Sequence, residues 1–452
     1  MRTERSSNGR VRSTAPVLGI VLLAAALSSG AAPAGGGKTI AITGGTVLTM
    51  AGPAIPGGVV LIRDGKIAEV GKDVVLPAGA EIVDARGRFV MPGIIDAMTY
   101  YGLRPQALND RENPLTPENR AGRGVYPFGE FLRGPGGIAV DREMLSGGVT
   151  TVYIAPGDQQ VIGGQGAVVK TWGRTFDGLV LREPAAIDMA IGDPALYERG
   201  QGATKSPINR MGIARLLRKS LSDAGEYARK RREYEAKSED EKAKGRPPEQ
   251  DPGLEAMGLL LDRKIPARLE TDYVDDIRTA LRLAEEYGFD LVIDSGLGAY
   301  KIKDALARRK IAVVLGAPSH PFVQGGEVSM TPDLYEEMSE YNARDLIRAG
   351  VKTAIASFGF SFGPFGQATQ SRWLLLEAAY ATGYGVSDDE ALRMVTINAA
   401  EILGVDGRVG SLAPGKDADV IILDGPPLSI RTWIDEVYID GQRVYSRQGG
   451  ER

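Results

Sequence analysis

The sequence predicts an α/β protein, a (β/α)₈ barrel with a small β-sandwich built from the two ends of the chain. In the middle, from about residue 94 to 403, apolar runs of strand length alternate with segments of helical periodicity, which is most simply a barrel of parallel strands. On either side of this region, short apolar alternations are broken by Gly and Pro, as in antiparallel β-structure.

Residues 1–34 have the layout of a secretory signal peptide. Arg2, Arg5, Arg10 and Arg12 precede an apolar run at residues 15–27, and small residues follow. The run is shorter than the roughly 20 residues of a membrane-spanning helix, and the chain has no cysteine to carry a lipid. We therefore expect export to the periplasm or the outside of the cell without a stable membrane anchor. An uncleaved anchor is the alternative.

The two β-rich ends are residues 38–93 and residues 404–447. In the first, Asp64-Gly65 separates two apolar runs, which is a strong hairpin signal. The second repeats this pattern with an apolar strand at residues 420–423 and a hairpin at Asp440-Gly441. We expect the two ends to pair into one small β-sandwich beside the barrel.

The barrel itself is expected over residues 94–403. Buried strands are predicted at residues 150–154, 291–294, 311–315 and 352–356, with helices between them at residues 276–287 and 301–309. Residues 222–252 carry a dense mixture of Glu, Lys and Arg, which is typical of an exposed helix and less so of an interaction tail. We interpret them as an insertion in the barrel.

Composition limits the possible functions. Fifty-four basic residues against 58 acidic ones give a net charge of −4, without the basic stripe that binds a phosphate backbone, so no nucleic-acid partner is expected. The chain has one histidine, His320, and no cysteine. Zinc sites are built from several imidazoles or thiolates. A zinc site of the usual kind is therefore excluded.

Four motifs carry a resemblance to a known family: VMPGIIDAMTY at residues 90–100, IGGQGAVVK at 162–170, TINAA at 396–400 and GKDADV at 415–420. Together they resemble the amidohydrolase superfamily, and in particular an exported branch similar to imidazolonepropionases and Xaa-Pro dipeptidases. The resemblance covers nearly all of the expected mature chain. It implies a barrel that uses divalent metal to hydrolyse C–N bonds in dipeptides or cyclic amides.

The resemblance also locates the family's metal-binding and catalytic positions, and this chain has other residues there. The two histidines of the first strand are replaced by Met98 and Tyr100, and those of two later strands by Glu270 and Ser295. The catalytic aspartate falls near Phe358, where no acid stands. A metal-bound water and a base to take its proton are both needed for this hydrolysis. We therefore predict no metal, no other cofactor and no catalysis by the family's route.

A ligand pocket can nevertheless persist at the carboxyl-terminal ends of the strands, where barrel enzymes have their sites. The candidate pocket residues are Asp96, Lys170, Glu270, Asp272, Asp294 and His320. Lys170 aligns with a lysine that in some members of the family is carbamylated and so bridges two metals. A salt bridge at the end of a strand is the simpler interpretation of it.

The leading hypothesis is a non-catalytic member of the family. It would be a subunit paired with an active paralogue, a homo-oligomer, or a binder of a peptide-like or cyclic-amide ligand. The alternative is a working C–N hydrolase whose site is rich in carboxylates, with Glu270, Asp272, Asp294 and Lys170 acting directly or through a divalent metal held by carboxylate oxygen. A purely structural protein with a filled barrel is a third hypothesis.

Overall fold

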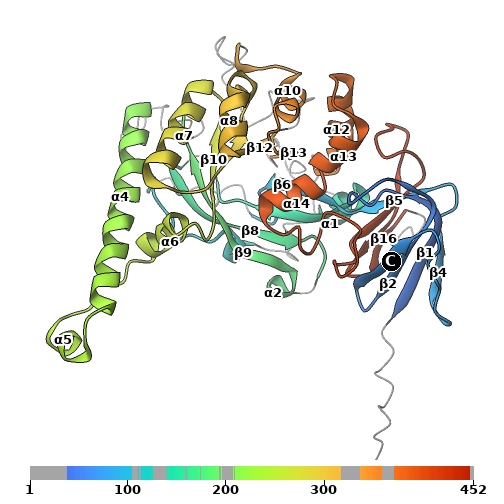
Figure 1. Ribbon diagram of the computed structural model, residues 1–452, viewed down its shortest axis with the longest axis horizontal. Helices are drawn as coiled ribbons and strands as arrows, with labels where there is room; N and C mark the ends of the chain where they lie inside the picture. Colours follow the sequence, from blue (N-terminus) through green and yellow to red (C-terminus); the bar gives the residue numbers. More distant parts are fainter. Residues whose placement is uncertain are drawn as a thin grey trace, which may run out of the picture. The chain divides into compact units, whose positions relative to one another are not determined.

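The computed structural model describes residues 38–103, 110, 113–125, 140–157, 160–173, 175–192, 195, 207, 209–316, 336–358 and 371–447. The predicted signal peptide and the candidate pocket residue His320 lie outside the described residues. Two sheets of eight strands each organise the rest (Figure 1). One contains strands from both ends of the chain, and the other contains the strands of the middle region.

The sheet from the two ends has the order β16-β15-β14-β5-β1-β2-β3, and β4 pairs with β1. Its strands are β1 (Thr39–Val47), β2 (Ile55–Arg63), β3 (Lys66–Gly71), β4 (Glu81–Asp84), β5 (Phe89–Pro92), β14 (Val420–Leu423), β15 (Ile434–Ile439) and β16 (Gln442–Ser446). Antiparallel pairing of β5 with β14 joins the two ends. The sheet also curls, because Ile67 exchanges backbone hydrogen bonds with residues 415 and 416. The separate β-unit built from both ends is confirmed, although its strands form one continuous sheet.

The second sheet is the barrel sheet, with the order β13-β12-β11-β10-β9-β8-β7-β6. Its strands are β6 (Ile94–Thr99), β7 (Val149–Ile154), β8 (Ile162–Lys170), β9 (Val180–Ala190), β10 (Ala267–Thr271), β11 (Leu291–Ser295), β12 (Ala312–Leu315) and β13 (Thr353–Ile355). β6, β7, β8, β10 and β11 are buried along their whole length. The predicted α/β barrel is therefore confirmed.

One strand departs from the regular repeat. β8 runs antiparallel to both β7 and β9, whereas the other neighbouring strands of the barrel sheet are parallel. Only residues 155–161 separate β7 from β8, and a parallel connection needs a crossover of about a dozen residues or more. The chain therefore turns back on itself. As a result, the carboxyl end of β8 lies beside the amino end of β7.

Helices accompany the parallel strands. They are α1 (Val140–Ser146), α2 (Phe176–Leu179), α4 (Arg210–Glu235), α5 (Glu239–Lys244), α6 (Pro252–Leu261), α7 (Val274–Tyr287), α8 (Lys303–Arg309), α10 (Asn342–Arg348), α12 (Leu374–Gly383), α13 (Asp388–Met394) and α14 (Ile397–Leu403), with 3₁₀ turns η2 (Ala121–Gly124) and η4 (Ala299–Ile302). α7 packs on β10 and β11, while α10, α12, α13 and α14 pack on β13. α7 buries one apolar face and ends at Gly288, whose φ of 75° suits a glycine cap.

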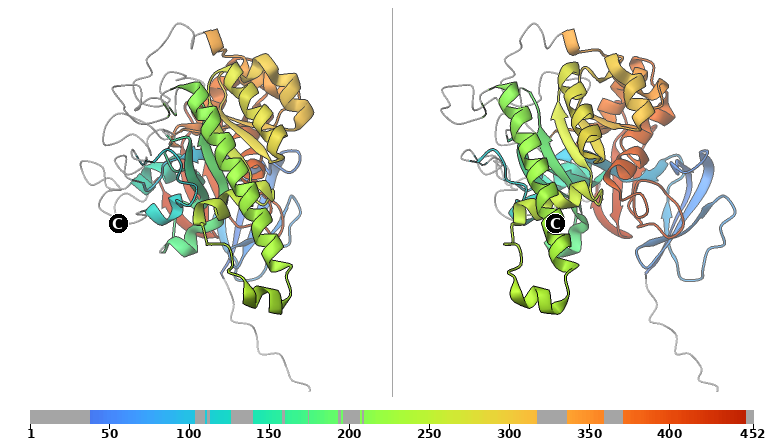
Figure 2. Two further views of the ribbon diagram at one scale, coloured as in Figure 1. Left: turned by 90° about the vertical axis from the view of Figure 1, so that its left-hand side faces the viewer. Right: turned by 60° about the vertical axis from the view of Figure 1, so that its left-hand side comes forward.

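The charged segment forms the far half of α4, the whole of α5 and the loop that follows. α4 buries Ile213, Leu217, Leu221 and Ala224, but no residue between 225 and 255 is buried. Pairs such as Arg229 with Glu233 connect successive turns of this exposed part, and each pair of this kind stabilises a helix by about 0.2–0.5 kcal/mol. Figure 2 shows this part of α4 extending away from the barrel sheet with α5 at its end.

Candidate functional site

The five positions that are expected from the resemblance to replace metal ligands and the catalytic acid lie at the carboxyl-terminal ends of four barrel strands, here called the rim. Met98 is on β6 and Tyr100 follows it, Glu270 is on β10, Ser295 ends β11, and Phe358 comes shortly after β13. The backbone N–H of Phe358 donates to the carbonyl oxygen of Met98 at 3.1 Å. The first and last strands of the barrel sheet therefore meet at this rim.

Three of the five side chains fill the rim with buried apolar surface. Met98, Tyr100 and Phe358 are 2%, 1% and 3% exposed. A thioether is a ligand for soft metals only, and a phenyl ring has no donor atom. The side chains of Met98 and Phe358 therefore contribute packing at the rim, and Tyr100 adds a buried phenol.

Asp96 connects the first strand to the segment that follows the last one. Its Oδ1 accepts the backbone N–H of Ser357 at 3.0 Å, and its Oδ2 accepts the hydroxyl of Ser371 at 2.6 Å. The carboxyl is fully buried, and this burial raises its pKa, although the hydrogen bonds from the two serines oppose the rise. Both carboxylate oxygens of Asp96 therefore hold the first barrel strand to the segment that follows the last one, which is a structural role in this arrangement.

Arg268 lies in the barrel interior, just below the rim. Its Nε and Nη2 donate to the two oxygens of Asp294 at 2.8 and 2.7 Å, and its Nη1 donates to the carbonyl oxygen of Ala97 at 2.6 Å. The guanidinium carbon also lies 4.0 Å from the centre of the Tyr153 ring. A residue that is 2% exposed thus links β6, β7, β10 and β11.

The same network continues to β9. The hydroxyl of Tyr153 donates to Oδ2 of Asp188 at 2.6 Å, while Oδ1 of Asp188 is buried and has no hydrogen-bond partner among the described residues. Burial raises the pKa of Asp188 to about 7. Gly166 on β8 leaves the space for this contact, since a Cβ there would lie 1.9 Å from the Tyr153 oxygen.

Glu270, Asp272 and Ser295 lie together at the rim. Thr271 and Ser295 are paired in the register of β10 and β11, and the Ser295 hydroxyl donates to the carboxylate of Asp272. Ser295 has a φ of 69°, which is a left-handed conformation unusual for a residue with a side chain. The structure therefore groups two of the candidate carboxylates with the serine that replaces a family histidine.

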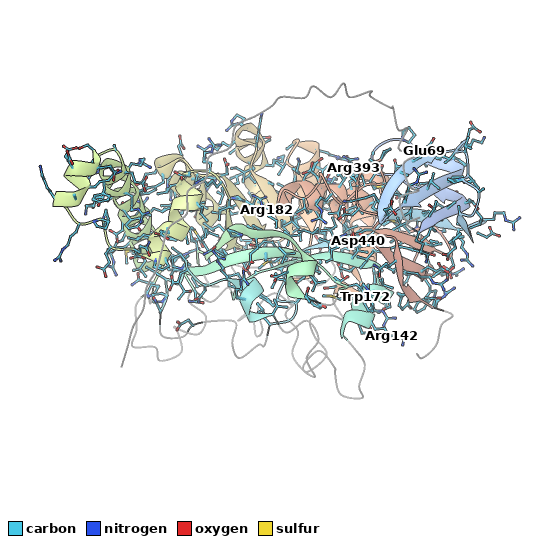
Figure 3. The ribbon with its side chains drawn as sticks, turned by 90° about the horizontal axis from the view of Figure 1, so that it is seen from below. Glu69, Arg142, Trp172, Arg182, Arg393 and Asp440 are labelled. Atoms are coloured by element: carbon cyan, nitrogen blue, oxygen red, sulfur yellow. The ribbon has the colours of Figure 1, made fainter. Side chains whose placement is uncertain are left out.

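Lys170 lies elsewhere. It pairs with Thr151 near the start of β7, at the end of the barrel sheet opposite to the rim, because β8 is antiparallel. Its ammonium contacts Asp417, Asp419 and Asp440 at 2.8, 3.0 and 2.5 Å, and its side chain is 2% exposed. Asp440 belongs to the turn between β15 and β16 (Figure 3). This is the arrangement that the salt-bridge interpretation predicted, and it holds the barrel to the curled sheet.

A divalent metal does not fit the donors at the rim and in the interior. Among the described residues, no group of three or more His, Cys, Asp or Glu is placed to hold one. Asp294 is bonded at both oxygens to a guanidinium, and Asp96 accepts hydrogen bonds at both of its own.

Within the same described part, no helix is long and apolar enough to cross a membrane.

Comparison with known proteins agrees with the fold and the motifs. The model of the Amidohydrolase family matches residues 332–444. The crystal structure of an amidohydrolase from Thermotoga maritima MSB8 is 32% identical, covers 90% of this chain and 100% of its own, and superposes with a TM-score of 0.78. The chain belongs to the amidohydrolase family. The predicted resemblance is thereby confirmed.

Other members of the amidohydrolase family are more distant. The amidohydrolase tasK of Hapsidospora irregularis is 24% identical over 90% of this chain, which spans only 43% of the length of tasK. The imidazolonepropionase of Solibacter usitatus is 26% identical, over 87% of this chain and 92% of its own. A solved prolidase, 19% identical with a TM-score of 0.55, shares the fold. These relatives are named as hydrolases or peptidases, in keeping with the predicted branch.

Proposed function

We propose that this amidohydrolase-family protein does not hydrolyse C–N bonds by the metal-dependent route and acts by binding. It would serve as a subunit beside an active relative, or it would hold a peptide-like or cyclic-amide ligand at the rim. The observation that supports this best is the burial of Met98, Tyr100 and Phe358, at three positions where the resemblance places the family's metal ligands or its catalytic acid.

The chemistry of the family explains why these residues matter. A bound metal lowers the pKa of its water, and a carboxylate then takes the proton and delivers it to the leaving amine. The position of that carboxylate is occupied here by Ser357 and Phe358. Without either function, a substrate that entered the rim would be held but not cleaved by this route.

One arrangement favours the second candidate, a hydrolase that works without the family's metal. Ser295 is held in a left-handed conformation and donates to Asp272, with Glu270 on the adjacent strand. Strained residues that contact carboxylates are frequent at catalytic sites. Asp294 and Lys170, which the sequence suggested for the same role, are bonded to Arg268 and to three aspartates instead.

Elemental analysis and hydrolase assays of the same preparation distinguish the two candidates. The chain is purified without chelator from cells supplied with zinc, manganese and magnesium, dialysed, and offered Xaa-Pro dipeptides, N-acyl amino acids and cyclic amides. We expect no stoichiometric metal and no turnover. Turnover that disappears in Glu270→Ala and Asp272→Ala, but not in the exposed control Glu226→Ala on α4, would establish the hydrolase. Turnover abolished by a chelator would refute the proposed function.

We also propose that the protein is exported, on the strength of the layout of residues 1–34. Fractionation of cells that express the full chain should find a shortened product in the periplasm or medium, and a full-length cytoplasmic product would contradict export. Light scattering of that product measures whether it is a homo-oligomer. Mixing it with an active relative encoded in the same genome tests the subunit role directly.

A further inference from the structure

We propose that the guanidinium of Arg268 is a fixed cation that takes the electrostatic place of the family's divalent metal and thereby excludes such an ion from the barrel. This inference concerns the barrel interior and stands whether or not the protein binds a partner or a ligand at the rim. It explains how a barrel that carries inward carboxylates remains stable after losing the ligands of a metal.

The position of the guanidinium supports this assignment. It contacts Asp294, the residue before Ser295, and the carbonyl of Ala97, the residue before Met98. Arg268 itself stands two residues before Glu270 on the same strand. The guanidinium of Arg268 therefore joins three of the strands that carry the expected ligand positions. Its contacts lie one residue before those positions on β6 and β11, deeper in the barrel.

The balance of charge in the barrel interior gives the physical reason why Arg268 would take the place of a divalent ion. Asp294 and Asp188 are both buried in the interior, at 1% and 7% exposed, and Oδ1 of Asp188 has no hydrogen-bond partner among the described residues. A carboxylate buried without a counter-charge is strongly unfavourable, and removal of one partner of a buried pair leaves that penalty uncompensated. Without Arg268, these two carboxylates and the nearby Glu270 would attract a cation that binds through oxygen.

The direct experiment is cation rescue of Arg268→Ala. Melting temperature is measured with increasing Mg²⁺, Ca²⁺ or Mn²⁺ and, separately, with millimolar ethylguanidinium. We expect the variant to melt well below the wild type and to regain several degrees with both kinds of cation, since ligands that bind only the folded state raise its stability. The wild type should show no such response.

Arg182→Ala is the matched control. Arg182 is half-buried on β9 and donates to the backbone carbonyls of Leu403 and Lys264 (labelled in Figure 3). Its loss removes an arginine without leaving a buried carboxylate behind, so neither divalent ions nor ethylguanidinium should restore the melting temperature. An equal response in both variants would mean that the effect is non-specific and would overturn the proposal.

A second variant keeps the test decisive if Arg268→Ala does not fold. Arg268→Met combined with Asp294→Leu removes the pair together, and it should fold and respond to both kinds of cation much less than Arg268→Ala does. Failure of this double variant to fold better than Arg268→Ala would overturn the proposal, because charge would not then be the cause. Stoichiometric divalent metal in the wild type would overturn it as well. Turnover without metal would refute the proposed function and leave this inference intact.

Discussion

Asp188 makes the stability of this barrel depend on pH near neutrality. Burial raises its pKa from the ordinary 3.8 to about 7, which corresponds to about 4 kcal/mol at 1.36 kcal/mol per pKa unit. Because the folded state holds the proton to higher pH than the unfolded state does, the free energy of unfolding falls as pH rises from about 4 to about 7 and changes no further above that. The figure of 4 kcal/mol is an upper limit, because water that penetrates the folded barrel would reduce the cost of burying the ionised carboxylate.

Asp188→Asn should remove this dependence. The amide resembles the protonated acid, so the variant should exceed the wild type by about 2 kcal/mol at pH 5 and by up to about 4 kcal/mol at pH 8. Urea unfolding of both proteins at these two pH values measures the difference. Asp223→Asn, at an exposed position on α4, is the control and should keep the wild-type slope.

Equal pH slopes in the wild type and Asp188→Asn would refute the reasoning. Such a result would mean that the carboxyl stays ionised in the folded state at pH 5, held by the guanidinium of Arg268 and the hydroxyl of Tyr153. The other charged group that faces this position is Asp294, which is itself bonded to Arg268. Burial raises the pKa of Asp294 as well, so its titration would add a slope of the same sign in both proteins.

Three further variants test the buried contacts. Gly166→Ala places a methyl group 1.9 Å from the Tyr153 oxygen and should destabilise the fold by about 1–3 kcal/mol in urea unfolding; no loss would mean that the Tyr153 ring moves freely. Lys170→Met leaves three aspartates without their shared cation and should cost about 3–5 kcal/mol, and an unchanged melting temperature would show that the pairing contributes nothing. Asp96→Asn replaces an acceptor of the Ser371 hydroxyl and should cost about 1–3 kcal/mol in the same assay, whereas a more stable variant would contradict a role for the carboxylate in closing the barrel.

The class of fold could be predicted because hydrophobic periodicity is a local property of the sequence. Runs such as residues 291–294 and 311–315 are strands in the structure, as expected. Periodicity carries no information on strand direction, however, so it does not predict that β8 is antiparallel. The short connection at residues 155–161 was the available signal, since it cannot contain a crossover.

Motifs indicate the five rim positions at which this chain is expected to differ from its family, but they do not indicate the network beneath those positions. Arg268 was visible as a charged residue inside an apolar strand, and Asp294 as an acid on the next strand. That they pair depends on the register of β10 and β11, in which Arg268 faces Val292 and reaches diagonally to Asp294. Register is set by the whole sheet and not by any short segment. The role of Tyr153 depends in addition on β8, where Gly166 makes room for it.

Hydrogen bonds between neighbouring strands hold the strained backbone of the rim. Ser295 and Phe358, at the ends of β11 and beyond β13, have φ angles of 69° and 54°, and conformations of this kind cost about 1–3 kcal/mol each. Neighbouring backbone bonds compensate: the N–H of Gly296 donates to the carbonyl of Thr271 at 2.9 Å, and that of Phe358 to the carbonyl of Met98. These bonds join adjacent strands of the barrel, so closure of the barrel is sufficient to impose the left-handed conformations of Ser295 and Phe358. The proposed loss of the metal ligands would therefore remove the chemistry of the family and leave in place the shape of the rim, and with it a surface able to bind.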